Sequence, residues 1–423
     1  MEVHRLAVAS RETVIARDVS NRLAGVWLPR SRFADVAALT NATLTLGPDA
    51  DAFYSLGWAQ SSTGQPRQAL DNYERALHLY REVGGRSNEA ATLNNIGRVH
   101  HHLGARQQAL TYYQRALPIQ RDVGDRAGEA TTLNNIGAAY NGLGDRQRAL
   151  TYYQQALPIQ REIGDRAGEA TTLNNIGRVH DHLGHQQQAL TYYQQALPIQ
   201  REIGDRAGEA TSLNNIGAAY NGLGDQQRAL SYYQQALPIQ REIGDRAGEA
   251  TSLNNIGAAY NGLGDQQQAL TYYQQALPIL GEIGNRADEA STLNNIGFVY
   301  DNLGDQQQAL TYYQRALPIQ RDVGDRAGEA AILNNIGAIR SQQGHFAEAK
   351  DTLDEVLGIF RMIGDRGSQA ATHFNMAVVL LQMARVDDAT EFQRQAIALA
   401  EQTSHPALDQ MRAFLVELEQ TRK

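Results

Sequence analysis

The chain has 423 residues, a formal net charge of -8 and no cysteine. The acidic balance argues against nucleic acid and anionic membranes as partners, and without cysteine there is no disulfide framework, thiol nucleophile or cysteine-based metal site. The sequence has no apolar run of roughly 18 residues that could span a membrane. Residues 1–25 break every apolar stretch with charged side chains, which argues against a secretory signal. We therefore expect a cytoplasmic protein.

A 40-residue period governs most of the chain. Nine units tile residues 50–409 without a gap, and periods of about 20–50 residues are typical of solenoids and propellers. The region before them, residues 1–49, departs from the pattern: residues 26–49 look like the second half of a degenerate repeat, with an irregular helix ahead of them. Because interior repeats bury both faces, terminal repeats need caps. We expect residues 1–49 to form an N-terminal helical cap.

The third unit, residues 130–169, shows the pattern of each repeat. Its first half carries apolar residues at the spacing of one helical face, and Gly144 then stands where a left-handed residue ends a helix. Asp145 is placed to cap a second helix, with the capping-box spacing in later copies at Asp265/Gln268 and Asp305/Gln308. The residues of the two stripes are Leu133, Ile136, Gly137, Tyr140 and Leu143, then Ala149, Leu150, Tyr153, Ala156 and Leu157.

Six of the second helices also contain an interior proline, Pro158 in the third unit and its copies at 118, 198, 238, 278 and 318. Proline removes one backbone hydrogen bond from a helix interior. Since the apolar stripe resumes at Ile163, we predict a bend rather than a break.

The positions Leu133, Ile136, Gly137, Tyr140, Ala149, Tyr153 and Ala156 resemble the tetratricopeptide repeat signature. The repeat length and the sequence pattern "GDRAGEA…LNNIG…LGD" are similar to those of the repeats of kinesin light chain and of spindle-orientation adaptors. Similar bacterial arrays are often appended to signalling ATPases of the NB-ARC type. The resemblance covers about 360 residues. It implies an all-α fold, a right-handed superhelical α-solenoid of helix–turn–helix repeats whose first helices line a concave wall.

The last residues, 404–423, read as a capping helix. Ser404-His405-Pro406 stands at its start, and its apolar stripe would cover the final repeat. That stripe is Leu408, Met411, Leu415 and Leu418.

A pair of asparagines recurs in the first helix of the units, at 134/135 in the third. On a helical wheel at about 100° per residue, the second asparagine lies opposite the core stripe, and the first points to the flank, where we expect it to bond to the adjacent repeat. One amide can pair with both the C=O and the N–H of an extended peptide, and the resemblance implies peptide capture by such ladders. The predicted ladder is Asn95, Asn135, Asn175, Asn215, Asn255, Asn295, Asn335 and Asn375. The alternative is that recent duplication copied a scaffold residue.

The copies differ at a few positions of the same wall. Trp58 and Phe298 are candidate apolar anchors, although Trp58 is equally suited to pack against the N-terminal cap. Arg98 with His102, and Arg178 with His182, share a helical face at i and i+4. These pairs predict positive spots for an acidic ligand; the alternative is that the arginines are simply solvated.

The sequence does not support a catalytic site or a metal site. His100 and His180 occupy the core tyrosine position, and His102 and His182 lie two repeats apart, roughly 20 Å, too far to share one metal ion. No phosphate-binding loop, zinc-protease or nucleophile-elbow motif is present. We expect no enzyme activity and no cofactor.

Two functions remain open. The first is a scaffold that binds a protein or peptide segment in the concave groove, with an acidic segment as the complement of the positive spots. The second is a structural or self-associating spacer, or the sensor arm of a larger NB-ARC-type ATPase.

Overall fold

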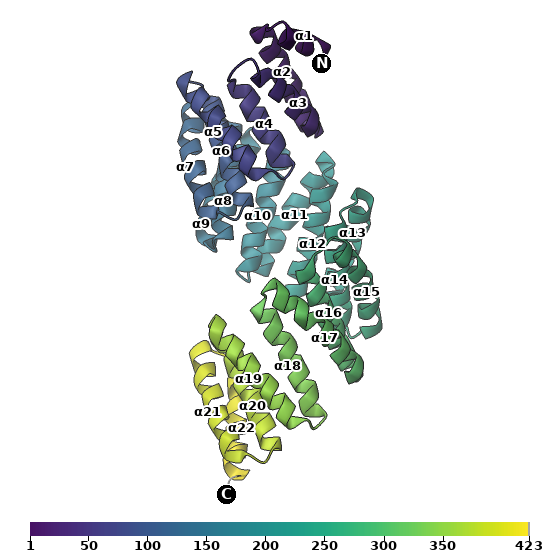
Figure 1. The fold of residues 1–423 in the computed structure, drawn as a ribbon. Coiled ribbons are helices and arrows are strands. Elements are labelled where there is room, and N and C mark those ends of the chain that lie inside the picture. The colour runs from purple at the N-terminus through teal and green to yellow at the C-terminus, as the bar shows by residue number, and fades with distance from the viewer. Residues whose placement is uncertain (422–423) are drawn as a thin grey trace. The chain divides into compact units, whose positions relative to one another are not determined.

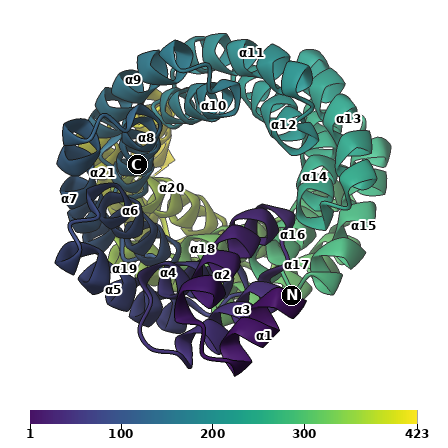
Figure 2. The same cartoon turned by 90° about the horizontal axis from the view of Figure 1, so that it is seen from above.

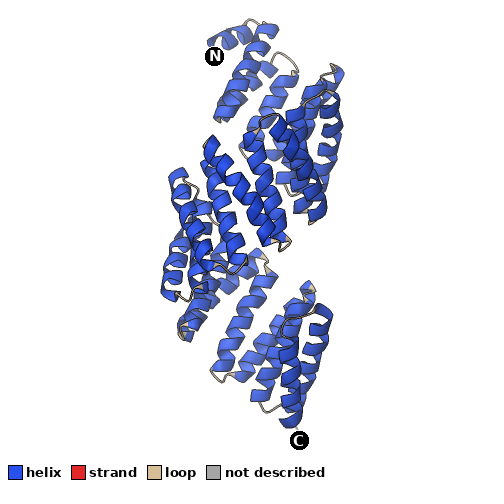
Figure 3. Cartoon of the chain, turned by 180° about the vertical axis from the view of Figure 1, so that it is seen from behind, coloured by secondary structure: helices blue, strands red, loops and turns tan. Residues whose placement is uncertain are grey.

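The computed structural model describes residues 1–421, and these residues form helices without any β-strand (Figure 3). The prediction of an all-α chain of paired helices is confirmed. No helix of the described part is both long and apolar enough to cross a membrane. The first helices of the nine expected units are α4 (Ala50–Ser62), α6 (Arg86–His102), α8 (Arg126–Gly142), α10 (Arg166–His182), α12 (Arg206–Gly222), α14 (Arg246–Gly262), α16 (Arg286–Asn302), α18 (Arg326–Gln342) and α20 (Arg366–Gln382).

The second helix of each unit follows after a short turn (Figure 1). These helices are α5 (Pro66–Glu82), α7 (Arg106–Asp122), α9 (Arg146–Glu162), α11 (Gln186–Ile203), α13 (Gln226–Ile243), α15 (Gln266–Glu282), α17 (Gln306–Val323), α19 (Phe346–Ile363) and α21 (Val386–Thr403).

The chain divides into two compact units: unit 1 is residues 1–219, and unit 2 begins at Tyr220. Within unit 1, the first helices α6, α8 and α10 lie on the inner side of a curved row, and α7, α9 and α11 lie on its outer side (Figure 2). Within unit 2, α14, α16 and α18 are likewise inner, and α15, α17 and α19 outer. In each unit the first helices therefore line the inner wall, as the resemblance implied. The right-handed superhelical path of the whole array stays a prediction.

The N-terminal region forms α1 (Glu2–Ala9), α2 (Thr13–Trp27), the 3₁₀ helix η1 (Leu28–Arg30) and α3 (Phe33–Leu44). A buried apolar cluster includes Trp27, Leu28, Val36 and Leu39 and reaches Ala59 of α4. Burial of this cluster joins the cap to the first repeat.

The helix ends follow the predicted chemistry. Gly144 takes the left-handed conformation, with a φ of +83°, and Asp145 accepts a hydrogen bond from the Arg148 N–H at 3.0 Å. Asp265 and Asp305 cap their helices in the same way. Pro158 lies inside an unbroken α9, so the prediction that proline does not break the helix is confirmed.

The last helix, α22 (Leu408–Thr421), packs against the final helix pair. Met411 and Leu418 are fully buried, whereas Leu415 is only half-buried. Phe414, which the sequence stripe left out, packs edge-on against Phe374 with ring centroids 5.5 Å apart.

A close contact between glycine and tyrosine holds the two helices of most repeats together. A Cβ atom added to Gly137 would lie 2.7 Å from the ring of Tyr153, which is fully buried on the next helix. Only a residue without a side chain allows this approach. The same contact recurs at Gly97/Tyr113, Gly177/Tyr193, Gly257/Tyr273 and Gly297/Tyr313.

This contact predicts opposite effects for one substitution at two equivalent glycines. Gly137→Ala should destabilise the protein by about 1–3 kcal/mol because the methyl group overlaps the Tyr153 ring. At Gly337 the facing residue is Leu353, and an added Cβ would lie 3.7 Å away. Gly337→Ala should therefore be neutral or stabilising, since alanine is the better helix former by about 1 kcal/mol. Denaturant unfolding of both variants tests this, and equal effects would contradict it.

A buried ion-pair clamp closes the junction between repeats. Glu129, on α8, is only 5% exposed and accepts hydrogen bonds from Arg121 at 2.7 Å and Arg126 at 2.6 Å. Arg126 also donates to Glu162 of α9 at 2.8 Å. The clamp thus ties the end of one repeat to both helices of the next. Equivalent glutamates with two arginine partners are Glu89, Glu169, Glu209, Glu249 and Glu329.

One junction in unit 2 lacks half of this clamp. Gly281 stands where the other copies have an arginine, so within residues 1–421 Glu289 pairs only with Arg286, at 2.6 Å. The Glu289 side chain is 18% exposed, compared with 7% for that of Glu129. The α15–α16 junction therefore has a less complete polar connection than its neighbours.

The clamp predicts a specific dependence of stability on pH. Burial alone raises the pKa of Glu129, but the hydrogen bonds from Arg121 and Arg126 outweigh it and hold the pKa below its usual range. A carboxylate with a lowered folded-state pKa stabilises the fold above the unfolded pKa of about 4.3, and the contribution is lost as pH falls through the folded value. Glu129→Gln should cost about 1–3 kcal/mol at pH 7 and much less at pH 3.

The control for this test is Glu162→Gln, because Glu162 is 61% exposed and pairs with Arg126 at the surface. It should cost little at either pH. A loss at Glu129→Gln that is the same at pH 3 and pH 7 in urea unfolding would show that packing, not charge, accounts for it.

Candidate peptide-binding face

The first asparagine of each pair connects neighbouring repeats, as expected from its place on the helix flank. In unit 1, Asn134 Oδ1 accepts hydrogen bonds from Thr172 Oγ1 at 3.1 Å and from Asn175 Nδ2 at 3.2 Å. Thr172 is fully buried. The amide oxygen of one repeat therefore satisfies two donors of the next. Asn94 bonds in the same way to Thr132 and Asn135.

The second asparagines form a half-exposed row on the first helices. Asn135 and Asn175 of unit 1 each donate one N–H to the first asparagine of the preceding repeat, and in unit 2 Asn335 and Asn375 do the same. An amide has two N–H donors and a carbonyl oxygen, so each keeps capacity for a ligand. Half-exposed members are also found at Asn215, Asn255 and Asn295.

Asn95 departs from the predicted ladder. It is 9% exposed, and its Nδ2 donates to the Tyr54 hydroxyl at 2.8 Å. Tyr54 and Ser55 replace the asparagine pair in the first unit. Because the larger tyrosine covers Asn95, the half-exposed row in unit 1 begins at Asn135.

The two arginines of the predicted positive spots have different environments. Arg178 is exposed and donates to Asn175 Oδ1 at 3.1 Å. Arg98 is half-buried near Tyr73: burial raises the pKa of Tyr73, and the positive charge of Arg98 opposes that shift. Arg178 is therefore the more available for a ligand.

His101 is a neighbour of Arg178 that sequence reasoning missed. Burial lowers its pKa first, and the charges of His102, Arg106 and Arg178 lower it further. Arg178 of α10 thus lies near enough to His101 of α6 to affect it. The signal in the sequence was the run His100-His101-His102, whose middle residue was given no role. His102 and His182 are both exposed.

His100 and His180 belong to the packing between helices, as predicted. Each stacks on a tyrosine of the next helix, His100 on Tyr112 at 5.3 Å and His180 on Tyr192 at 5.4 Å between centroids. Tyr140 stacks on Tyr152 in the same manner. Among residues 1–421 no group of three or more metal-ligating side chains converges.

The two candidate apolar anchors also differ. Phe298 of unit 2 is 44% exposed on α16. Trp58 is half-buried against the N-terminal apolar cluster and meets Tyr54 edge-on, with centroids 6.3 Å apart. The packing role foreseen for Trp58 is present.

Each of the two units contains a cavity. In unit 2, a cavity of about 240 Å³ lies beside Asn334, Gly337, Leu353 and Asn375. It lies at a contact where leucine replaces the tyrosine of the first seven repeats.

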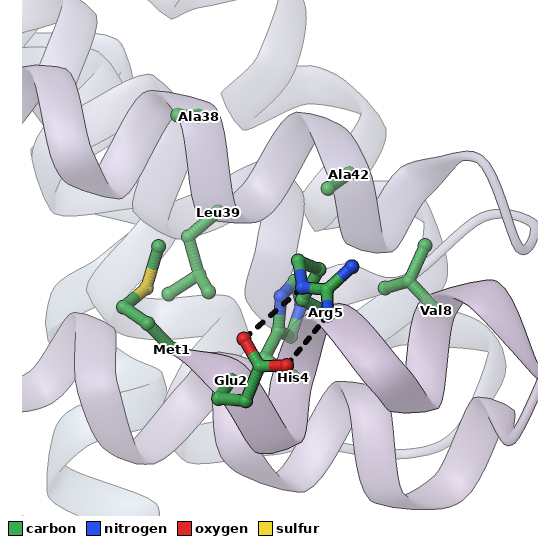
Figure 4. Close-up of a pocket in the computed structure, with 8 residues that line it drawn as sticks. All are labelled: Met1, Glu2, His4, Arg5, Val8, Ala38, Leu39 and Ala42. Carbon is green, nitrogen blue, oxygen red and sulfur yellow. Dashed lines mark hydrogen bonds and ion pairs between the residues drawn. The ribbon is translucent and has the colours of Figure 1, made fainter.

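In unit 1, an apolar cavity of about 250 Å³ lies between α1 and α3 and is bordered by Met1, Val8 and Leu39 (Figure 4). Its only positive side chain besides a histidine, Arg5, already pairs with Glu2, so this cavity belongs to cap packing rather than to a charged site.

Comparison with protein-family models gives a direct result. The tetratricopeptide repeat model matches in overlapping stretches that run from residue 50 to residue 402. The chain belongs to the tetratricopeptide repeat family. No curated protein matches its sequence.

Solved structures of other tetratricopeptide-like proteins share the fold at low identity. A signal transduction ATPase with numerous domains from Pyrococcus horikoshii, which has a tetratricopeptide repeat sensor, superposes with a TM-score of 0.63 at 17% identity; the match covers 89% of this chain and 55% of that one. The apo quorum sensor NprR from B. thuringiensis gives 0.58 at 17% identity, covering 80% and 99%. The apo form of RapI gives 0.54 at 17% identity, covering 65% and 99%.

Proposed function

We propose that this tetratricopeptide repeat chain is a non-catalytic binding module, located in the cytoplasm, that captures an extended peptide or protein segment on the inner wall of unit 1. The observation that carries the proposal is the row of half-exposed amides at Asn135, Asn175 and Asn215, at 40-residue intervals. Asn135 and Asn175 each use one N–H within the chain, which leaves the second N–H for a ligand. The quorum sensor NprR shares the fold and is consistent with a ligand-sensing role.

We further propose that the bound segment is acidic. Arg98 of α6 and Arg178 of α10 place positive charge on first helices of unit 1, whereas the chain as a whole is acidic. A local positive field on an acidic protein favours a carboxylate-bearing partner.

A second candidate is the sensor arm of a larger signalling ATPase. The match to 55% of the P. horikoshii protein, which contains a tetratricopeptide repeat sensor, favours it. This role is compatible with ligand capture, because a sensor arm also needs a ligand.

The amide row predicts that the two asparagines of a pair have different roles: the second contributes to peptide binding and the first to stability. Peptides selected from a random display library on the full chain serve as ligands. Asn175→Ala with Asn215→Ala should weaken their binding by about tenfold or more while changing the melting temperature little, because Asn134 keeps its bond from Thr172.

The matched control is Asn134→Ala with Asn174→Ala. These residues accept the bonds of Thr172 and Ser212 from the next repeat, so their loss should lower the melting temperature. If both double variants lose binding and stability in parallel, the second asparagines are scaffold and the proposed site is wrong.

If the ligand is recognised by charge, the affinity for the peptide should depend on salt, and Arg98 and Arg178 should account for that dependence. Raising the salt concentration should weaken peptide binding, because exposed charges are screened over about 8–10 Å at physiological ionic strength. Arg98→Ala with Arg178→Ala should remove most of that dependence in a fluorescence anisotropy titration.

The control is Arg75→Ala with Arg115→Ala, which removes the same charge from α5 and α7. It should leave the salt dependence nearly intact. Selected peptides that carry no acidic residues, or that bind equally at low and high salt, would count against an acidic ligand.

A further inference from the structure

The asparagine row of unit 1 ends at a pocket of different chemistry. A cavity of about 290 Å³ lies between α2, α4 and α6, and its walls include Trp58, Tyr54, Leu28 and Asn21. Asp51 is the one charged residue among those that line it. Tyr54, which accepts the hydrogen bond from Asn95, connects the pocket to the row.

The carboxylate of Asp51 is fixed in place but not neutralised. Oδ1 accepts from the Tyr80 hydroxyl at 2.6 Å, and Oδ2 accepts from Asn21 Nδ2 at 3.1 Å. Neighbouring Asp49 pairs with Arg17 at 3.2 Å, whereas Asp51 has no ion-pair partner within residues 1–421. The pocket therefore holds an oriented negative charge that its own walls leave without a counter-ion.

The tyrosine partner stays a donor at ordinary pH. Burial raises the pKa of Tyr80 above its usual range, and the hydrogen bond and charge of Asp51 raise it further. Asp51 thus remains the acceptor in this bond, and its charge remains for a ligand.

The aromatic walls complete a setting that favours an organic cation. Trp58 and Tyr54 meet at an interplanar angle of 84°, with centroids 6.3 Å apart. Ammonium and guanidinium groups bind to tryptophan and tyrosine faces within about 6 Å, and a carboxylate adds charge-assisted hydrogen bonds. No other unit repeats this combination, because Asp51, Tyr54 and Trp58 correspond to Thr131, Asn134 and Ala138 in the third unit.

We infer that this pocket binds an organic cation, the ammonium or guanidinium group of a ligand, beside the ring of Trp58 and the carboxylate of Asp51. In the peptide complex, which rests on the proposed function, a basic group here and acidic residues over Arg98 and Arg178 would fix the direction of the bound segment. The cation site itself does not depend on the peptide being bound.

The test uses small probes and the full chain. The protein has two tryptophans, so a ¹⁵N-labelled sample gives two indole signals, which Trp58→Phe assigns. N-acetyl-arginine amide should shift the Trp58 signal and leave that of Trp27, which is 7% exposed in the cap. N-acetyl-citrulline amide has the same shape without the charge and should give at least tenfold weaker binding.

The variants test the role of the carboxylate. Asp51→Asn should weaken the binding of the arginine probe by roughly tenfold or more. Asp71→Asn on α5, whose carboxylate pairs with Arg75, should not. Because Asp51→Asn also alters the bonds to Tyr80 and Asn21, the comparison of arginine with citrulline on the unaltered chain gives a result that does not depend on the variant.

A third probe distinguishes the source of the cation. Norleucine amide carries only an α-ammonium group, so its binding would assign the site to a peptide N-terminus, and binding of the arginine probe alone would assign it to a side chain. Equal shifts from arginine and citrulline probes, or unchanged binding in Asp51→Asn, would overturn the cation site. Peptide capture by the asparagine row would stand or fall separately, on the display-selected peptides.

Discussion

The amide oxygen of the first asparagine sets the relation between one repeat and the next. In unit 1 the oxygen of Asn134 receives a buried hydroxyl and an amide from the following repeat. A buried donor left without an acceptor costs free energy, so these bonds favour one register of adjacent first helices. The bond from Asn175 Nδ2 also fixes the side chain of the second asparagine. The row that faces a ligand is thus positioned by the contacts that stabilise the array.

Each repeat combines three contacts with different physical origins. The glycine–tyrosine contact sets how closely the two helices approach, the asparagine bonds join successive first helices, and the glutamate clamp ties each second helix to the repeat that follows. Because all three recur, no single repeat bears the stability of the chain, as expected of repeat arrays. The incomplete clamp at Gly281 and the leucine at 353 are local exceptions within unit 2.

The residues that can select a particular ligand are those that differ between the repeats. A uniform wall of small residues and amides can hold a backbone but cannot choose a sequence. Arg178 adds positive charge in the middle of the unit 1 wall, and Asp51 with Trp58 adds the opposite charge and an aromatic surface at its end. Opposite charges at two places on one wall provide a means to select both the ligand and its direction.

The sequence by itself determined the helices and their ends. Periodicity, glycine at positive φ and aspartate caps act within a few residues, so the stripe around Leu133, the turn at Gly144 and the cap at Asp145 could be predicted. It also placed the two asparagines on the correct sides of the helix, because a wheel gives direction relative to the helix's own core.

Only the tertiary structure decided what occupies those directions. Asn95 is covered by Tyr54, Arg98 lies against Tyr73, and Glu129 meets arginines on both sides of a turn. These outcomes depend on side chains from neighbouring helices, and a helical wheel contains no neighbours. The pocket at Asp51 likewise exists because α2 of the cap comes to lie beside α4, a contact that no periodicity in the sequence encodes.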